Sequence, residues 1–292
     1  MELCVDFGGT EIKLAVIEGA GIMASGTIPV TGSTADLDAA ATASLALIDG
    51  ADVTPTAVGI AVPGVVDPAT GLMLHANDKY DFLEGFDLHS WAQDELGLPA
   101  VVENDARAAL IGETSTGSAS GERDAVLVTL GTGIGTAAII DGVPLRGVTG
   151  HAGILGGHVT TDIHGPTCPC GNVGCGEALA SSWALQQGTV KDLFESDERA
   201  EIRDEFLRVW GTTVVTLCHM YDPTVVILSG GILRAGDAVR YPIEDHVREH
   251  LWPSMTAPRF IVPPEPEYSV ARGLSTLARQ AHPTTAIDQE TH

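Results

Sequence analysis

The sequence predicts an α/β protein made of two similar halves, and three observations support this prediction. Segments with strand character alternate with segments of helical period along most of the 292 residues. Two glycine-rich segments, 3–19 and 126–142, share one layout of strand, glycine turn, strand, acidic residue and glycine. His158 and three cysteines lie close together in the stretch 157–177, which indicates a metal-ligand loop in the second half.

The predicted elements follow the hydrophobic periodicity of the chain. The first half is expected to hold the hairpin 3–19, helix 35–49, strand 56–62, loop 64–88, helix 89–97, strand 99–104 and helix 105–116. The second is expected to hold strands 125–130 and 136–140, the cysteine-rich loop, helix 198–221, strand 224–230 and helices 236–250 and 269–281. The polar tail 283–292 is expected to be frayed.

The repeat sets the expected domain limits. We predict an N-terminal domain over residues 1–118 and a C-terminal domain over residues 119–271. A C-terminal helix over 272–284 is expected to pack back on the first domain.

Both hairpin turns are rich in glycine. Tight glycine turns expose backbone N–H groups, which can hold phosphate oxygens. One such turn is more often only a turn, but a facing pair on duplicated domains favours a phosphate chain held from both sides of a cleft. The sequence has no G-x-x-x-x-G-K-[ST] motif, and Gly131, Gly133 and Gly135 lie between two strands, so a P-loop and a Rossmann dehydrogenase are disfavoured.

The cysteine-rich stretch has the composition of a structural zinc site. Three thiolates and one imidazole close a tetrahedral zinc site without leaving a position for water. Glycines at 165, 171 and 174 allow the tight turns that such a site needs. Buried cysteines or a disulfide are the alternatives, but Cys4 and Cys218 lie in apolar runs and nothing in the sequence indicates secretion. The expected ligands are His158, Cys168, Cys170 and Cys175.

The composition limits the class of partner. Hydrophobic residues make up 44% of the chain and charged residues 18%, as in a folded globular protein. The formal net charge of −24 opposes binding to nucleic acid or to an anionic membrane. No apolar run approaches the ~20 residues of a membrane span and no N-terminal signal pattern is present, so a cytoplasmic protein is expected.

Taken together, these motifs resemble the ROK family, whose members are sugar kinases and related repressors on the actin-like ATPase fold, a duplicated ribonuclease H-like fold. The likeness runs from residue 3 to about residue 276. The phosphate-loop and adenosine-side motifs are D-F-G-G-T at 6–10, L-G-T-G-I-G at 130–135 and L-S-G-G-I at 228–232. The sugar-side motifs are A-V-P-G-V-V-D at 61–67 and E-N-D at 103–105, and the zinc stretch keeps the family spacing through Glu177.

The resemblance implies an ATP- and Mg²⁺-dependent kinase acting on a hexose or hexose-like substrate. Asp105 would be the general base that takes a proton from the sugar hydroxyl, whereas its plain alternative is a helix N-cap. Asp6 would orient hydrated Mg²⁺. The implied sugar contacts are Gly64, Asn104, Asp105, His158 and Glu177. The implied ATP contacts are Asp6, Gly8, Gly9, Thr10, Lys13, Gly131, Thr132, Gly133, Gly230 and Gly231.

Two departures from the family pattern border the implied sugar pocket. The family usually reads A-G-E-I-G-H before the zinc histidine, and this chain reads G-I-L-G-G-H at 153–158, so Leu155 replaces the sugar-binding glutamate. An alkyl side chain cannot accept a hydrogen bond, which changes the substrate that fits. Loop 77–86 carries extra acidic residues where the family has a short N-x-x-G-W segment. Glucose, the commonest family substrate, is the best single expectation, and an amino sugar, an N-acetyl sugar or a cyclitol is the alternative.

Two other classes of protein agree less well with the sequence. ROK repressors carry a helix-turn-helix domain before the first phosphate motif, and Asp6 leaves no room for one, so DNA binding is not expected. A non-catalytic sugar sensor is supported by Leu155 alone and opposed by Asp6, Asp105 and Thr132. Because the family is usually dimeric or tetrameric, a homodimer or homotetramer is expected.

Overall fold

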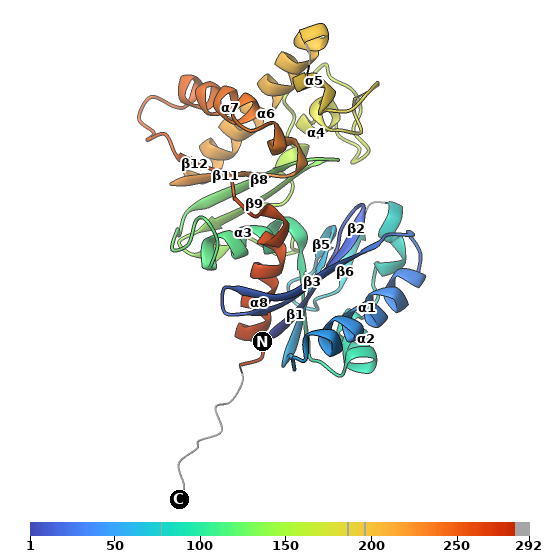
Figure 1. Cartoon of the computed structure of the whole chain (residues 1–292). Helices are drawn as coiled ribbons and strands as arrows, with labels where there is room; N and C mark the ends of the chain where they lie inside the picture. Colours follow the sequence, from blue (N-terminus) through green and yellow to red (C-terminus); the bar gives the residue numbers. More distant parts are fainter. Residues whose placement is uncertain (77, 186, 196, 284–292) are drawn as a thin grey trace, which may run out of the picture. The chain divides into compact units, whose positions relative to one another are not determined.

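The computed structural model describes residues 1–76, 78–185, 187–195 and 197–283. By the packing of its residues the chain divides into two compact units (Figure 1). Unit 1 comprises Met1–Ala108 and the described residues from Val270 onward, and unit 2 comprises Ala109–Ser269. The predicted tail lies outside the described residues from 284 on.

Unit 1 is built on a five-stranded sheet of order β3-β2-β1-β4-β7. Its strands are β1 Glu2–Phe7, β2 Glu11–Glu18, β3 Gly21–Pro29, β4 Ala57–Val62 and β7 Ala100–Asn104. The first three form an antiparallel meander, whereas β1, β4 and β7 run parallel to one another. The carboxyl ends of these three strands therefore share one edge, which is where open α/β sheets place ligands.

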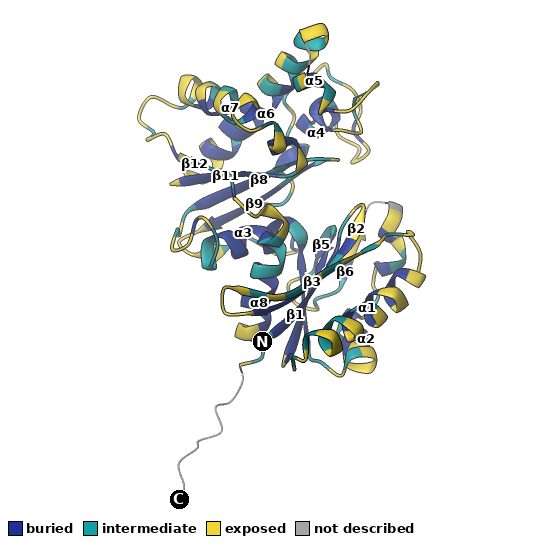
Figure 2. Ribbon diagram, viewed as in Figure 1, coloured by how far each residue is buried: buried dark blue, intermediate teal, exposed yellow. Residues whose placement is uncertain are grey.

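Alternation along β1 assigns helices to the two faces of this sheet. Leu3 and Val5 enter a core with α1 Ala35–Ala51 and α2 Leu88–Leu96. Cys4 points the opposite way, as strand geometry requires, into a cluster with Leu274 of α8 Ser269–Ala281. Figure 1 shows α8 next to the sheet of unit 1, and Figure 2 shows that the strands of this sheet are largely buried. At Gly59 a Cβ atom would lie 2.6 Å from the Cβ of Leu274, so glycine allows α8 to approach β4 closely.

Unit 2 repeats the same sheet. Its strands are β8 Ala125–Leu130, β9 Ile134–Ile140, β10 Val143–Pro144, β11 Val225–Ser229 and β12 Arg259–Ile261, in the order β10-β9-β8-β11-β12. Helices α6 Ala200–Tyr221 and α7 Asp237–His250 pack with Val126, Val128 and Leu130 in its core. The two sheets match strand for strand, which confirms the duplicated α/β fold predicted from the glycine-rich repeat.

Several stretches hold more regular structure than predicted. The expected loop 64–88 contains β5 Gly64–Val66 paired with β6 Met73–Ala76, and then the 3₁₀ helix η1 Asp78–Leu83. Strands β3, β10 and β12 and helices α4 Gly176–Ala180 and α5 Asp192–Glu195 were also not predicted. The other 3₁₀ helices are η2 Gly156–His158, η3 Asp197–Arg199, η4 Gly231–Ala235 and η5 Pro266–Tyr268. These segments are too short to show a hydrophobic period, so only long-range pairing and packing define them.

The chain crosses between the units twice. The first crossing lies inside α3 Asp105–Ser115, between Ala108 and Ala109, and the second lies at the start of α8. The predicted domain limits, residues 1–118 and 119–271, remain a prediction. None of the helices in the described ranges combines the length and the apolar character that a bilayer crossing requires.

Candidate functional site

The predicted site residues of unit 1 gather where its parallel strands end. Asp6 is near the end of β1, Gly64 follows β4, and Asn104 ends β7. Asp105 is the first residue of α3. The strand order therefore brings together residues that lie far apart in the sequence.

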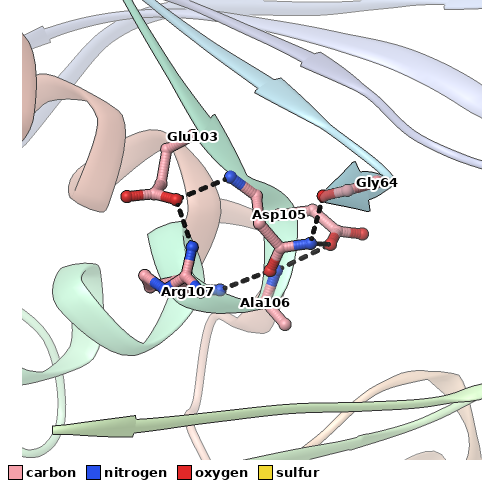
Figure 3. Close-up of polar contacts among 6 residues, drawn as sticks. Gly64, Glu103, Asp105, Ala106 and Arg107 are labelled. Atoms are coloured by element: carbon pink, nitrogen blue, oxygen red, sulfur yellow. Dashed lines mark hydrogen bonds and ion pairs between the residues drawn. The ribbon is translucent and has the colours of Figure 1, made fainter. Parts of the chain in front are cut away.

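Asn104 fixes the position of Asp105, which Figure 3 shows together with Gly64 and Ala106. Its Nδ2 donates to the Gly64 carbonyl at 3.1 Å and to Oδ1 of Asp105 at 3.0 Å. Its Oδ1 accepts from the backbone N–H of Arg107 at 3.0 Å, and Asp105 Oδ1 also accepts from Ala106 N–H at 2.7 Å. The side-chain amide is thus used on both ends, and the Asp105 carboxylate is held rigidly at the start of α3.

Gly64 lies at a position where no side chain would fit. A Cβ atom there would lie 2.4 Å from the carbonyl oxygen of His75 on the paired strand β6. Because the Gly64 carbonyl also receives the Asn104 amide, the β5–β6 hairpin and the end of β7 are fixed to each other.

A buried ion pair joins the residues on either side of Asn104 and Asp105 in the sequence. The side chains of Glu103 and Arg107 are 5% and 1% exposed, and Arg107 Nη1 lies 2.6 Å from Glu103 Oε1 (Figure 3). The same oxygen accepts from the backbone N–H of Asn104 at 2.9 Å. A buried pair costs desolvation, so its benefit is to fix geometry: it anchors the turn from β7 into α3.

Three charged side chains of unit 1 interact electrostatically: Asp105, Asp6 and Lys13. Burial raises the pKa of Asp105, and the hydrogen bonds from Ala106 and Asn104 oppose this rise. Burial also raises the pKa of Asp6 to about 7, which the Lys13 charge lowers and the Asp105 charge raises. Lys13 Nζ lies 4.0 Å from Asp6 Oδ2. A general base works best when its pKa lies near the working pH, so the upward shift of the Asp105 pKa favours proton transfer to this residue.

Asp6 also fits the expected role beside a metal ion. Its Oδ1 is buried and has no hydrogen-bond partner within the described part of the chain. A carboxylate oxygen oriented in this way can receive a water of hydrated Mg²⁺, which keeps several waters when it binds to proteins.

The first predicted phosphate turn joins β1 to β2 through Gly8, Gly9 and Thr10. Gly8 N–H bonds back to the Asp6 carbonyl at 3.0 Å, and a Cβ on Gly8 would lie 2.8 Å from the Glu11 carbonyl oxygen. Gly9 and Thr10 are exposed, and nothing lies within 4 Å of a Cβ built on Gly9. The turn therefore presents open backbone next to Asp6.

The second predicted phosphate turn, Gly131–Gly133, is tied to the helix that follows the cysteine loop. Glu177, in the first turn of α4, accepts from the backbone N–H of Ile134 at 2.8 Å. A Cβ on Gly133 would lie 2.4 Å from Glu177 Oε2, so glycine lets this carboxylate lie close against the turn. Ser182, which the sequence did not single out, donates its hydroxyl to the Gly131 carbonyl at 2.8 Å. Thr132, between the two glycines, is exposed.

Gly230 and Gly231 follow β11 in the same unit. Gly230 has φ +96°, and a Cβ there would lie 2.3 Å from the carbonyl oxygen of Leu130. Glycine therefore lets the end of β11 lie close to the end of β8, where the second turn begins. Nothing lies within 4 Å of a Cβ built on Gly231, which is exposed.

The structure brings the four predicted zinc ligands together in unit 2. Their donor atoms all lie within 4.8 Å of one another, and all five cysteines are free. The Cys170 and Cys175 sulfurs are 3.7 Å apart, and Cys168 Sγ lies 3.6 Å from His158 Nδ1. Tetrahedral zinc with ~2.3 Å bonds to sulfur requires sulfurs about 3.8 Å apart, so the cluster fits a closed structural site.

Leu155 lies at the N-terminal end of η2, which leads to His158. Its carbonyl accepts from the His158 N–H at 3.0 Å, and its side chain is 43% exposed. An exposed leucine offers no hydrogen-bond acceptor to a substrate hydroxyl.

Loss of one thiolate is expected to remove the metal. In a Cys170→Ser variant we expect most of the bound zinc to be lost and thermal unfolding to shift to lower temperature, because structural zinc contributes directly to folding. Metal analysis by mass spectrometry and a thermal melt measure the two effects. Cys218→Ala, in the core of unit 2, is the matched control and should keep its zinc. Full zinc content in Cys170→Ser would contradict the assignment of the ligands.

Two duplicated sheets, each opening with a glycine-rich hairpin, define a protein of the actin-like ATPase fold class. The sequence profile of the ROK family matches residues 2–281, and the chain belongs to this family.

Known relatives include enzymes and regulators. The chain is 32% identical over 284 residues to a glucokinase of Streptomyces coelicolor, covering 85% of this chain and 87% of the relative. It is 28% identical over 215 residues to the xylose repressor of Bacillus spizizenii, covering 68% of this chain but only 54% of the repressor. Among solved structures, a ROK family glucokinase of Streptomyces griseus in complex with glucose and AMPPNP superposes with a TM-score of 0.81. That structure is 27% identical and covers 96% of this chain and 99% of its own.

Proposed function

We propose that the protein is an ATP-dependent kinase that transfers the terminal phosphoryl group to a hydroxyl, expected to be primary, of a hexose or hexose-like polyol. The observation that carries this proposal is the Asp105 carboxylate, held by Asn104 and Ala106 beside Asp6 and Lys13, with its pKa raised by burial. The sugar kinases among its relatives support the same class of reaction.

In the proposed reaction Asp105 accepts the proton of the attacking hydroxyl. Both side-chain and backbone hydrogen bonds from Asn104 and Ala106 end on Oδ1, so Oδ2 is the oxygen proposed to take the proton. In phosphoryl transfer, positioning and charge neutralisation supply most of the rate, so a rigidly held base and ordered phosphate turns matter equally.

The phosphate side of the proposal uses both glycine turns. The exposed backbone of Gly9 and Thr10 and that of Thr132 and Gly133 would receive phosphate oxygens, with Gly230 and Gly231 on the adenosine side. Asp6 would hold Mg²⁺ through water, and the bound ion would neutralise developing charge on the phosphates.

The sugar side of the proposal uses Gly64, Asn104, His158 and Glu177. His158 directs Nδ1 toward the thiolates of the cluster, which leaves Nε2 for a sugar hydroxyl. Zinc held by this cluster would have a structural role, and it would fix the orientation of the His158 ring.

Leu155 bears on which sugar the protein binds, because it replaces a hydrogen-bond acceptor with an alkyl side chain. A site built to hydrogen-bond a hydroxyl rejects an analogue that lacks it by about 10⁴-fold, so loss of one acceptor changes which ring substituent is favoured. We propose glucose as the first substrate to test. An amino sugar, an N-acetyl sugar or a cyclitol is the alternative that Leu155 favours. The same residue is the observation that favours a second class, a sugar sensor without turnover.

The assay that separates these proposals measures ADP release with ATP and Mg²⁺ across a panel. The panel contains glucose, mannose, fructose, allose, N-acetylglucosamine, N-acetylmannosamine, kanosamine and cyclitols, each measured against a reaction without acceptor. We expect acceptor-dependent release with at least one hexose-like compound. Turnover of glucose would favour the glucokinase reading, and turnover confined to a substituted sugar would make Leu155 the discriminating residue. Binding of ATP and sugar without any release would favour the sensor.

A further inference from the structure

Cationic side chains are scarce in the segment that carries the proposed base. In residues 1–108 the only Lys and Arg side chains are Lys13, Lys79 and Arg107. Arg107 is buried and paired with Glu103. The other two both lie at the first glycine turn, Lys13 on β2 and Lys79 on η1.

Lys79 is placed at this turn by its own contacts. Its Nζ donates to the Gly9 carbonyl at 2.8 Å, and its side chain is exposed. An ammonium has three N–H donors, so two remain available after this bond. The ammonium therefore lies at the Gly9 carbonyl, and no atom comes within 4 Å of a Cβ built on this glycine.

Tyr80 anchors η1 at this position. Its hydroxyl donates to the Gly8 carbonyl at 2.8 Å, and its ring is 1% exposed and packs edge-on against Phe7 with centroids 5.9 Å apart. Consecutive residues of η1 therefore bind consecutive carbonyls of the turn. The ring fixes the backbone, and the neighbouring lysine delivers a charge.

We propose that Lys79 contacts the terminal phosphate of the bound nucleotide and, with Lys13, forms a cationic pair around the first glycine turn. This inference rests on the proposed kinase function. A chain with a net charge of −24 repels an anionic nucleotide overall, so local cations must supply the attraction.

The terminal phosphate is favoured over the inner ones by the position of the proposed base. The turn begins next to Asp6, because Gly8 N–H bonds to the Asp6 carbonyl at 3.0 Å and Lys13 Nζ lies 4.0 Å from Asp6 Oδ2. The same Lys13 charge also acts on Asp105, so the turn lies on the side of unit 1 where the acceptor hydroxyl would be deprotonated. In-line transfer requires the transferred phosphoryl group to be next to that hydroxyl. A lysine at this turn would therefore stabilise the charge of the group in transfer.

The test compares two substitutions of Lys79 with two controls. Lys79→Gln keeps a hydrogen-bond donor without the charge, and Lys79→Arg keeps the charge. Tyr80→Phe removes the bond to Gly8 and retains the packed ring. Lys191→Gln makes the same charge change on an 81% exposed side chain of unit 2. Calorimetric titration with Mg²⁺ and either ADP or a non-hydrolysable ATP analogue gives affinities without any sugar, and initial rates follow for each accepted substrate.

We expect Lys79→Gln to weaken the binding of the triphosphate analogue by about 10-fold and the binding of ADP by less. We expect the same substitution to lower kcat by roughly 10- to 100-fold. Lys79→Arg should stay within about 3-fold of the wild type, and Lys191→Gln should not change either quantity. Wild-type values in Lys79→Gln would overturn the inference. The inference would also be overturned if Lys79→Gln lost the same affinity for ADP as for the analogue and Tyr80→Phe showed the same loss. In that case the lysine would only support the turn.

The outcomes also separate this inference from the proposed function. If the wild type binds the analogue but phosphorylates no sugar in the panel, the kinase proposal fails while the titrations still decide the role of Lys79. If the wild type binds no nucleotide, both proposals are wrong.

Discussion

Replacing Asp105 with asparagine is expected to lower kcat by about 10²- to 10⁴-fold while leaving nucleotide affinity within about 3-fold of the wild type. Asparagine still presents Oδ1 to the Ala106 N–H and to the Asn104 amide, so the geometry at the start of α3 is retained. Its amide Nδ2 takes the place of Oδ2 and cannot accept a proton. The change therefore removes the base but keeps the hydrogen bonds that position residue 105. Steady-state kinetics measures the loss of rate, and a calorimetric titration measures the affinity for nucleotide.

The control for this variant is Asp94→Asn, which makes the same charge change at an exposed position of α2 in the same unit. It should keep the wild-type rate. The wild-type rate is also expected to fall as pH drops through the pKa of Asp105, which burial holds above the ordinary aspartate value, because the base is then protonated. A near-normal rate in Asp105→Asn would show that another group accepts the proton.

Replacing Arg107 with methionine is expected to destabilise the fold by about 3–5 kcal/mol. The cause is the Glu103 carboxylate, which is buried and loses its cationic partner at 2.6 Å. Denaturant unfolding measures the change. Arg123→Met is the matched control, because Arg123 and Asp141 form an ion pair with side chains 65% and 83% exposed, and exposed pairs contribute less than about 1 kcal/mol.

A second substitution shows whether the buried charge is the cause. In the double variant Glu103→Gln, Arg107→Met the carboxylate is neutralised, so part of the lost stability should return. The two sites are in contact, and their effects are therefore not additive. A double variant that is less stable than Arg107→Met would contradict this explanation and indicate lost packing instead.

The fold was predictable where local patterns repeat. The hairpin at 3–19 and its counterpart at 126–142 each combine a β-branched strand with a glycine turn, and both form antiparallel pairs. The β5–β6 hairpin was not predictable, because it depends on Gly64 pairing with Ala76 across an ordinary-looking loop. Strand β12 has only three residues and gains its structure from pairing with β11.

The site was predictable where a residue type carries its own chemistry. The cluster predicted to bind zinc could be recognised because three cysteines and His158 share one short stretch, and the structure brings their donor atoms together. Lys79 was not identified, because its proposed role depends on η1 folding onto a turn seventy residues earlier in the chain. The Glu103–Arg107 pair had a detectable signal in its i,i+4 spacing, but spacing alone does not distinguish a buried pair from an exposed one.

The central claim is that this chain moves the terminal phosphoryl group of ATP onto a sugar hydroxyl. Phosphorus NMR of a reaction with ATP, Mg²⁺ and the acceptor panel follows that group directly. The proposed function predicts an acceptor-dependent phosphomonoester signal that grows as the γ-phosphate signal of ATP declines, and Asp105→Asn should suppress it. Formation of inorganic phosphate alone, at the same rate with and without acceptor, would contradict the claim.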